Sequence, residues 1–201
     1  TQADGLVLAA FPERATPWDA IVGAKLGDLP HGAVVGTGSP RRIAQLKAVR
    51  PDLRTQELRG NVGTRLRKVA EGEVEAAVLA EAGLARLERA DAIAEVLPLE
   101  VMVPAPGQGV LAVETRSAGS IRHLVEAIGH PDLTPLVESE RSLLAETGAG
   151  CRSALGALAQ WDDGRIRMDA FVEDHHGTRR TRVFGDHPGD VVVAARRELG
   201  L

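Results

Sequence analysis

The feature that most constrains the fold is an alternation of short apolar runs with helical stretches along residues 32–89. Apolar runs at 32–37, 53–58 and 75–80 are followed by helical spacing at 41–49, 62–70 and 81–89. Strands that alternate with helices at this distance predict a parallel sheet, because each helix carries the chain back to the same end of the sheet. The sequence therefore predicts an α/β body.

The chain on either side of this body has a different pattern. Residues 5–11 read as a strand, and the stretch 101–109, with its prolines and glycines, precedes a further strand at 110–114. Such an interruption is typical of a chain that crosses between domains or turns sharply. The remaining expected elements are helices at 121–128, 133–146 and 190–199 and antiparallel strands at 153–160, 165–173 and 178–184. They predict a smaller α+β unit at the C-terminal end.

Composition excludes several classes of function. The 201 residues include a single cysteine, which excludes an internal disulfide framework and a multi-cysteine zinc site. A net charge of −4 and an aromatic content of 2% argue against a nucleic-acid surface. The sequence has neither a membrane-length apolar run nor a signal-peptide pattern, so we expect a cytoplasmic protein. Because Thr1 stands almost directly before a strand, we expect that preceding chain is absent.

The first segment that can carry chemistry is the strand-to-helix turn at residues 36–42. Ser39 is a candidate N-cap with Pro40 at the first helical position, so the turn offers free backbone N–H groups to an anion. Arg41 and Arg42 are unfavourable in a first helical turn unless an anion lies beside them. The alternative is a pair of solvated arginines next to a capping turn, and the residues alone leave both open.

The second segment, residues 58–65, repeats this layout with Arg59 and Arg65 on either side of a glycine turn. Asn61 and Arg65 are four residues apart and share a helix face. In a parallel sheet both turns lie at the carboxyl ends of strands, where α/β folds place ligands. Neither turn matches a Walker or Rossmann fingerprint. The sequence thus predicts a site for a carboxylate-rich anion.

The third segment is the glycine-rich loop that leads to Cys151. A lone cysteine is commonly a small buried hydrophobe, which is the alternative here. The glycines, however, allow the thiol to reach a cleft, and Arg152 favours the thiolate. A nearby histidine partner is lacking, so a hydrolase nucleophile has little support, whereas a thioether anchor needs only access.

Six segments in order, GTGSPRR, LRGNVGTR, AEAGLARL, PAPGQG, ESERSLL and GAGCRSALG, resemble the porphobilinogen deaminase family across nearly the whole chain. The resemblance implies an α/β fold with parallel-sheet lobes like those of periplasmic binding proteins, plus a small C-terminal α+β domain. It implies that 1–12 and 110–127 are a remnant of domain 1, that 15–102 are domain 2, that 103–109 are a hinge, and that 130–201 form the C-terminal domain with the cofactor cysteine.

The family's reaction joins four porphobilinogen units into hydroxymethylbilane with release of ammonia, on a dipyrromethane cofactor. The resemblance therefore implies a deaminating transferase of heme biosynthesis that acts as a monomer on porphobilinogen and the growing polypyrrole chain, without metal, nucleic acid or membrane. It assigns the cofactor, held by a thioether, to Cys151. The residues it assigns to cofactor and substrate binding are Arg41, Arg42, Arg59 and Arg65 for the carboxylates, Ser39 and Asn61 for hydrogen bonds, and Arg86 and Gln108 as further members.

Two departures from the family pattern matter. The family's catalytic aspartate belongs to a His-Ser-x-Lys-Asp motif that this sequence lacks, so we expect no catalytic residue in this chain. Two rival interpretations follow: a noncatalytic carboxylate-binding fragment, and a fragment that is active only when the missing segment is supplied. The second departure is local, with Arg152 and Ala154 where many relatives have an uncharged residue and a proline, and it bears on the geometry of the loop.

Overall fold

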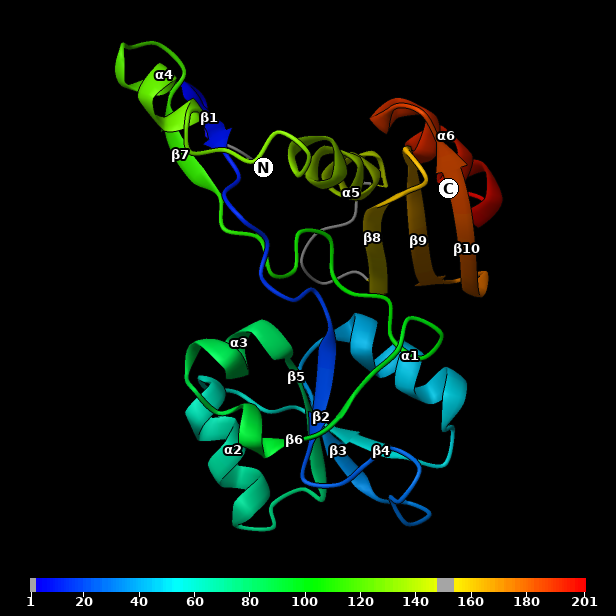
Figure 1. Ribbon diagram of the computed structural model, residues 1–201. Coiled ribbons are helices and arrows are strands. Elements are labelled where there is room, and N and C mark those ends of the chain that lie inside the picture. Colours follow the sequence, from blue (N-terminus) through cyan, green and yellow to red (C-terminus); the bar gives the residue numbers. More distant parts are fainter. Residues whose placement is uncertain (1–2, 148–153) are drawn as a thin grey trace.

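The computed structural model describes residues 3–147 and 154–201, which form three separate sheets (Figure 1). The largest sheet has the order β4-β3-β5-β2-β6. Its strands are β2 (Asp19–Val22), β3 (Val34–Gly36), β4 (Arg54–Gln56), β5 (Ala76–Ala80) and β6 (Ile93–Val96). The intervening helices are α1 (Pro40–Val49), α2 (Val62–Ala70), α3 (Glu81–Arg86) and the 3-10 turn η1 (Ala90–Ala92). We call residues 19–96 the α/β body.

The body confirms the predicted alternation of strands and helices and adds two strands that the alternation does not contain. Strands β4, β3 and β5 are parallel, whereas β2 lies between β5 and β6 and runs antiparallel to both. The sheet is therefore mixed. Strand β2 has only four residues and no helix next to it in the sequence, so a pattern of alternating elements does not reveal it.

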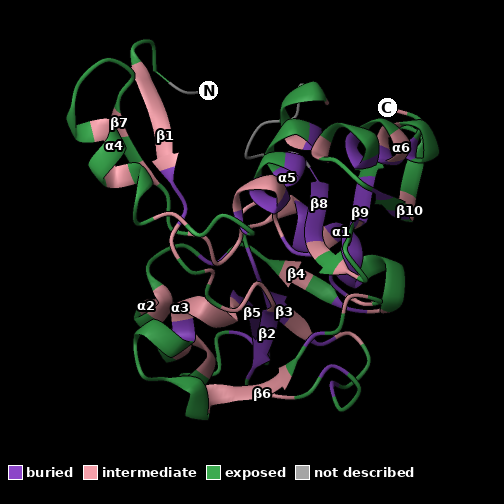
Figure 2. Cartoon of the chain, turned by 45° about the horizontal axis from the view of Figure 1, so that its top comes forward, coloured by how far each residue is buried: buried purple, intermediate pink, exposed green. Residues whose placement is uncertain are grey.

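Both faces of the body sheet are covered at its centre, which explains why the central strands β3 and β5 are apolar, whereas the edge strand β4 is polar. On one face Ile21, Val35 and Val78 pack with Leu46 of α1. On the other face Ala77 and Leu79 pack with Leu84 of α3 and the apolar side of α2. Side chains along a strand alternate between faces, so a short strand such as β5 contributes to both clusters. Figure 2 shows the buried strands at the centre of the body.

The C-terminal part is a three-stranded antiparallel sheet with two helices on one face. It consists of β8 (Ala154–Asp162), β9 (Arg165–Asp174), β10 (Gly177–Gly185), α5 (Thr134–Glu146) and α6 (Pro188–Leu199). Ile166 and Met168 of β9 pack against Leu143 of α5 and Val191 of α6, and all four are fully buried. The β8–β9 turn places both Asp163 and Gly164 at positive φ, as tight hairpins require. The predicted strands and helices of this part are confirmed to within a few residues.

The third sheet is a small one that stands apart from the others (Figure 1). It pairs β1 (Leu6–Ala10) with β7 (Val113–Arg116) and carries the short helix α4 (Ile121–Glu126). An isolated two-stranded ribbon is marginally stable in water. Large apolar side chains remain exposed around it: Leu111, Ile121, Leu124 and Ile128. These exposed side chains lie on α4 and on the segments next to α4 and β7, and no described part of the chain covers them.

Two segments run side by side between the three sheets, and we call them the first crossing segment, residues 11–18, and the second crossing segment, residues 97–112 (Figure 1). The N–H of Ala15 donates to the carbonyl of Gly109 at 2.9 Å. The side chain of Gln108 donates to the carbonyl of Pro17 at 2.6 Å. Gly109 has φ +81°, and an added Cβ would lie 2.6 Å from the Ala15 carbonyl oxygen. The close contact of the two segments therefore requires glycine here.

A buried carboxylate fastens the crossing segments to the C-terminal part. Glu140 of α5 accepts two hydrogen bonds from the Arg14 guanidinium, at 2.7 and 3.2 Å. It also accepts from the backbone N–H groups of Gly107, at 2.6 Å, and Ala159, at 2.9 Å. Burial raises the pKa of Glu140, while Arg14 and the two N–H groups oppose that rise. One side chain thus joins both crossing segments to α5 and β8.

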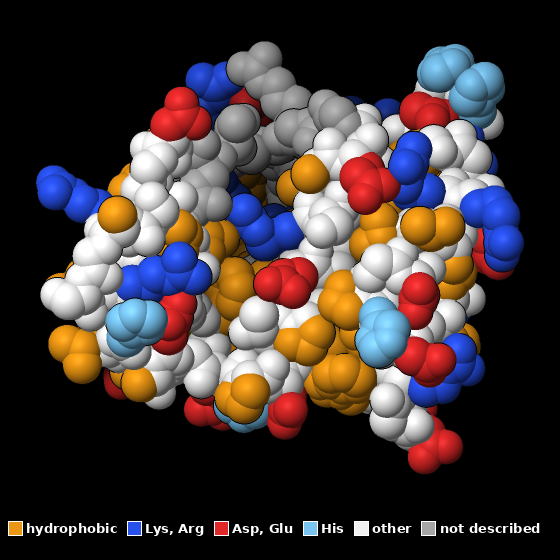
Figure 3. Space-filling model, turned by 90° about the horizontal axis from the view of Figure 1, so that it is seen from above, with side chains coloured by type: hydrophobic (Ala, Val, Ile, Leu, Met, Phe, Trp, Pro, Cys, Tyr) orange, Lys and Arg blue, Asp and Glu red, His pale blue; other side chains and the backbone are white. Residues whose placement is uncertain are grey.

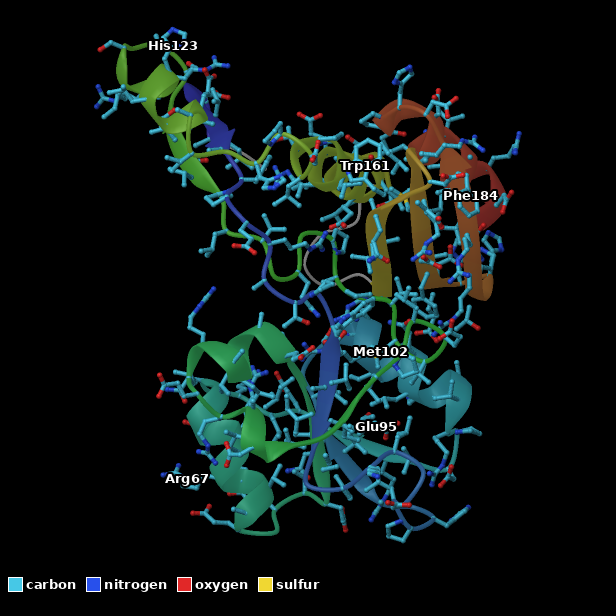
Figure 4. All side chains as sticks on the ribbon, in the orientation of Figure 1. Arg67, Glu95, Met102, His123, Trp161 and Phe184 are labelled. Carbon is cyan, nitrogen blue, oxygen red and sulfur yellow. The ribbon has the colours of Figure 1, made fainter. Side chains whose placement is uncertain are left out.

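The three-stranded sheet contacts both the body and the second crossing segment. Arg180 of β10 lies 5.1 Å above the Phe171 ring. It donates to Gln45 of α1 at 2.9 Å and to the carbonyls of Leu99 and Val101. Met102 lies on the second crossing segment beside α1 (Figure 4), where its sulfur accepts from Gln45. Among the described helices none is long and apolar enough to cross a membrane.

Candidate anion-binding site

The two glycine turns border one pocket of about 400 Å³, which we call the turn pocket. The turns follow β3 and β4, which are neighbouring parallel strands, so both lie at the same edge of the sheet. The lining residues are Gly38, Ser39, Arg42, Glu57, Leu58, Arg59, Gly60 and Arg65. The structure thus places three arginines and one carboxylate around a single concave site.

Both helices at the pocket start with a side-chain cap. The Ser39 hydroxyl accepts from the N–H of Arg42 at the start of α1, and the Asn61 side chain accepts from the N–H of Thr64 at the start of α2. These caps fix the first turns of the two helices and hold the positive ends of their dipoles toward the turns. The local sequence, a strand followed by glycine and then by a capping residue, therefore builds the pocket edge.

Arg42 forms the buried base of the turn pocket. Its Nε donates to Asp19 at 2.9 Å and its Nη1 donates to the Val78 carbonyl at 2.9 Å. Burial lowers the pKa of Arg42; Asp19 opposes the change, and the nearby Arg41 and Arg65 add to it. Because burial and two like charges disfavour this cation, an anion in the pocket would stabilise it.

Arg59 and Arg65 form the outer side of the pocket. The Arg59 side chain is 85% exposed and pairs with Glu57 at 3.0 Å, and this hydrogen bond raises the pKa of Arg59. Arg65 donates from Nε to the carbonyl of Gly60 at 3.1 Å. Because an ion pair this exposed to solvent is weak, Arg59 can leave Glu57 for a better anion at little cost.

Arg41 points away from the turn pocket, unlike its neighbour. Its Nη1 donates to Asp19 at 2.8 Å and to the Val103 carbonyl at 2.6 Å, and its Nη2 donates to Gln108 at 3.3 Å. Asp19 is fully buried. Burial alone would raise the pKa of Asp19, but Arg42 and Arg41 together hold it below its ordinary value. The two adjacent arginines therefore share one carboxylate and have different surroundings.

The structure brings together only part of the predicted site. Ser39, Arg42, Arg59 and Arg65 line the turn pocket. The other predicted residues that the structure describes lie outside its lining: Arg41, Asn61, Arg86 and Gln108. Arg86 ends α3 and is exposed, Asn61 caps α2, and Gln108 lies on the second crossing segment. Cys151 and Arg152 lie outside the described residues.

Sequence reasoning missed Asp19, the carboxylate that holds both arginines. The residue starts β2, a strand that was not predicted. The signal that could have found it is a lone acidic residue at the head of the apolar run AIV. A carboxylate beside a buried strand requires a cationic partner, and the arginines at 41 and 42 are obvious candidates.

A second concavity, of about 420 Å³, lies between the first crossing segment, α5 and β8. Its wall includes Leu133, Leu136 and Trp161, and its single arginine, Arg14, is already paired with Glu140. On the face shown in Figure 3, basic and acidic side chains are interspersed among the described residues. The turn pocket, with three arginines, is therefore the better candidate for an anion.

The fold and the pocket together define a class of protein: a mixed α/β body whose strand-end turns present arginines, joined to an antiparallel α+β part. Comparison with known families agrees. A family model described as "Porphobilinogen deaminase, dipyromethane cofactor binding domain" matches residues 1–122, and one described as "Porphobilinogen deaminase, C-terminal domain" matches residues 134–198. The chain belongs to the porphobilinogen deaminase family, a family of tetrapyrrole biosynthesis.

Individual relatives support this membership. The chain is 49% identical over 186 residues to the porphobilinogen deaminase of Thermobifida fusca, covering 89% of this chain and 58% of the relative. It is 46% identical to that of Acidothermus cellulolyticus, covering 88% of this chain and 56% of the relative. It is 44% identical to that of Pelotomaculum thermopropionicum, covering 95% and 62%. The chain thus spans less than two thirds of the length of these relatives.

Among solved structures, a TRAP periplasmic solute binding protein from Pseudomonas putida F1 with bound D-glucuronate matches with a TM-score of 0.41 and 14% identity. The match covers 73% of this chain and 46% of that protein.

Proposed function

We propose that the protein to which this chain belongs joins four porphobilinogen units into hydroxymethylbilane and releases ammonia. The observation that carries the proposal is the turn pocket, in which Arg42, Arg59 and Arg65 surround one site. Each porphobilinogen ring carries an acetate and a propionate group. A guanidinium binds a carboxylate through two parallel hydrogen bonds, so several arginines around one pocket suit a substrate with repeated carboxylates.

The dipyrromethane cofactor of the family fits the residues of this pocket. Its rings carry the same carboxylates, and Arg42 is a buried cation whose pKa is lowered by burial and by neighbouring arginines. When bound, the cofactor supplies the pyrrole to which substrate rings are added. We propose that Arg42, Arg59 and Arg65 hold its carboxylates, that Ser39 adds a hydrogen bond, and that Cys151 is its thioether anchor.

The same residues would act on each incoming ring. Arg59 can exchange Glu57 for a substrate carboxylate, because an exposed ion pair is weak. Arg42 stays fixed by Asp19 and Val78, so it offers an unmoving cation. No residue of this sequence matches the family's His-Ser-x-Lys-Asp motif, and we therefore assign no proton transfer to this chain.

A second candidate function is noncatalytic carboxylate binding by this part of the protein alone, for which the three arginines of the turn pocket suffice. A third is activity that depends on a complementary polypeptide. The exposed apolar side chains around α4 favour the third, since such a face is commonly covered by another part of a protein. Mixing this chain with a polypeptide that supplies the part of the relatives' length outside the match, and assaying ammonia release, separates the second candidate from the third.

We also propose that the domain boundaries follow the family. On this proposal 1–12 and 110–127 belong to domain 1, 15–102 to domain 2, 103–109 to the hinge and 130–201 to the domain with the cofactor cysteine. The protein would act as a monomer in the cytoplasm.

The experiment that tests the proposal is a calorimetric titration with porphobilinogen. Arg59→Leu should weaken binding at least tenfold, because it removes a cation from the pocket. Arg67→Leu is the matched control. Arg67 lies on α2 (Figure 4), two residues from Arg65, but it is not among the residues that line the turn pocket, so this variant should bind within twofold of the unchanged chain. Equal affinities for both variants and the unchanged chain, with circular dichroism showing intact folds, would contradict the proposal.

A further inference from the structure

Asp19 has an unusual position among the charged side chains that the structure describes. It is fully buried, and each of its oxygens meets a different arginine, Oδ1 at Arg42 and Oδ2 at Arg41. The group of three charges keeps one net positive charge inside the protein. Buried ion pairs are weak sources of stability, because the desolvation of the charges offsets their attraction. A role in stability alone therefore explains this arrangement poorly.

The two arginines lead to different places. Arg42 lines the turn pocket. Arg41 reaches the second crossing segment through the Val103 carbonyl and the Gln108 side chain. Gln108 in turn donates to Pro17 of the first crossing segment, and its carbonyl accepts from Arg14. A continuous set of hydrogen bonds therefore runs from the pocket through Asp19 to both crossing segments.

We propose that Asp19 is a positioning residue that divides the arginine pair between two tasks: it directs Arg42 into the turn pocket, and it holds Arg41 on the second crossing segment. This inference rests on the proposed function only in that the pocket binds carboxylates. It makes Arg41 a residue that fixes the crossing segments, rather than a ligand of the substrate.

The geometry supports this division. Asp19 is the first residue of β2, directly after the first crossing segment, so its carboxylate is fixed by a buried strand. Arg41 and Arg42 are adjacent on α1, and adjacent helical residues point about 100° apart. The two guanidiniums bind different oxygens of the one Asp19 carboxylate. Their other contacts lie in different places, at the turn pocket for Arg42 and on the second crossing segment for Arg41. Removal of its charge would free both guanidiniums at once.

The test uses the whole chain and tricarballylate, a tricarboxylate without a pyrrole ring, as the probe. Two quantities are measured: the dissociation constant of the probe, and the hydrogen exchange of the backbone amides of residues 103–110. Asp19→Asn should raise the dissociation constant at least tenfold and speed the exchange. Arg41→Lys should change the dissociation constant less than threefold and speed the exchange to a similar extent. Arg42→Lys should raise the dissociation constant without changing the exchange.

Asp52→Asn is the matched control, because Asp52 pairs with Arg50 just beyond the other end of α1. It should change neither quantity. The proposal is overturned if folded Asp19→Asn binds the probe like the unchanged chain, if Arg41→Lys weakens binding as much as Arg42→Lys, or if the unchanged chain does not bind the probe. Should Asp19→Asn fail to fold, the contrast between the two lysine variants decides. Failure of the deaminase proposal is seen separately, as absence of a pyrrole adduct on Cys151.

Discussion

Replacement of Glu140 by glutamine should destabilise the chain far more than its small change in shape suggests. Each carboxylate oxygen accepts from two donors: Oε1 from Arg14 and Ala159, and Oε2 from Arg14 and Gly107. In either orientation of its amide, a glutamine at this position places its NH₂ group, which is a donor, where two other N–H groups also donate. The Arg14 guanidinium, whose side chain is 12% exposed, would also lose its counter-charge.

Loss of one partner from a buried ion pair costs about 3–5 kcal/mol. For a chain of this size that free energy corresponds to a fall in melting temperature of about 6–20 °C. The assay is urea unfolding followed by tryptophan fluorescence, because Trp161 lies on β8, the strand whose Ala159 N–H donates to Glu140. Glu138→Gln, an exposed position on the same helix, serves as the control and should cost less than about 0.5 kcal/mol. A loss of less than about 1 kcal/mol in the free energy of unfolding for Glu140→Gln would show that the Arg14–Glu140 pair contributes little to stability.

Three further predictions concern other parts of the chain. Gly109→Ala should lower the free energy of unfolding by about 1–3 kcal/mol, because the positive φ of Gly109 and the nearby Ala15 carbonyl exclude a Cβ. Urea unfolding measures this loss, and a loss near zero would contradict the prediction. Arg50 lowers the pKa of Asp52 from 3.8 to about 2, so the stability that this ion pair contributes is present above pH 4 and lost as the pH falls toward 2. In thermal melts between pH 2 and pH 5, the melting temperature of Asp52→Asn should therefore fall less with pH than that of the unchanged chain. Identical pH profiles for the two proteins would contradict this. Leu124→Glu should change the free energy of unfolding by no more than about 0.5 kcal/mol, since Leu124 is 73% exposed. It should also reduce ammonia release when this chain is mixed with the complementary polypeptide. A large loss of stability would show that Leu124 packs against the rest of this chain.

The sequence predicted those elements whose signals are local. The Ser39 cap, the glycine turns and the helices behind them depend on a few neighbouring residues, and the structure has them where the pattern indicates. Asn61 was expected on the face of the second helix, whereas it is the N-cap of α2. The sequence also predicted that the two turns lie together, because neighbouring parallel strands end at the same edge of a sheet. The sequence did not predict strand β2, since a run of four residues without a neighbouring turn or helix signal resembles many loops.

The directions of the arginine side chains could not be derived from sequence either. Arg41 and Arg42 are chemically identical neighbours, and only Asp19, over 20 residues away, separates their roles. Glu140 likewise belongs to a predicted helix, but its partners come from residues 14, 107 and 159. Such long-range contacts depend on the three-dimensional packing, which local periodicity does not encode.

The attachment of dipyrromethane to Cys151 is tested by the intact mass of this polypeptide, purified from cells that make porphobilinogen, beside a Cys151→Ala version. We expect a dipyrromethane-sized increase in mass for the unchanged chain and none for the variant. The same unmodified mass for both would contradict the claim that this chain holds the cofactor.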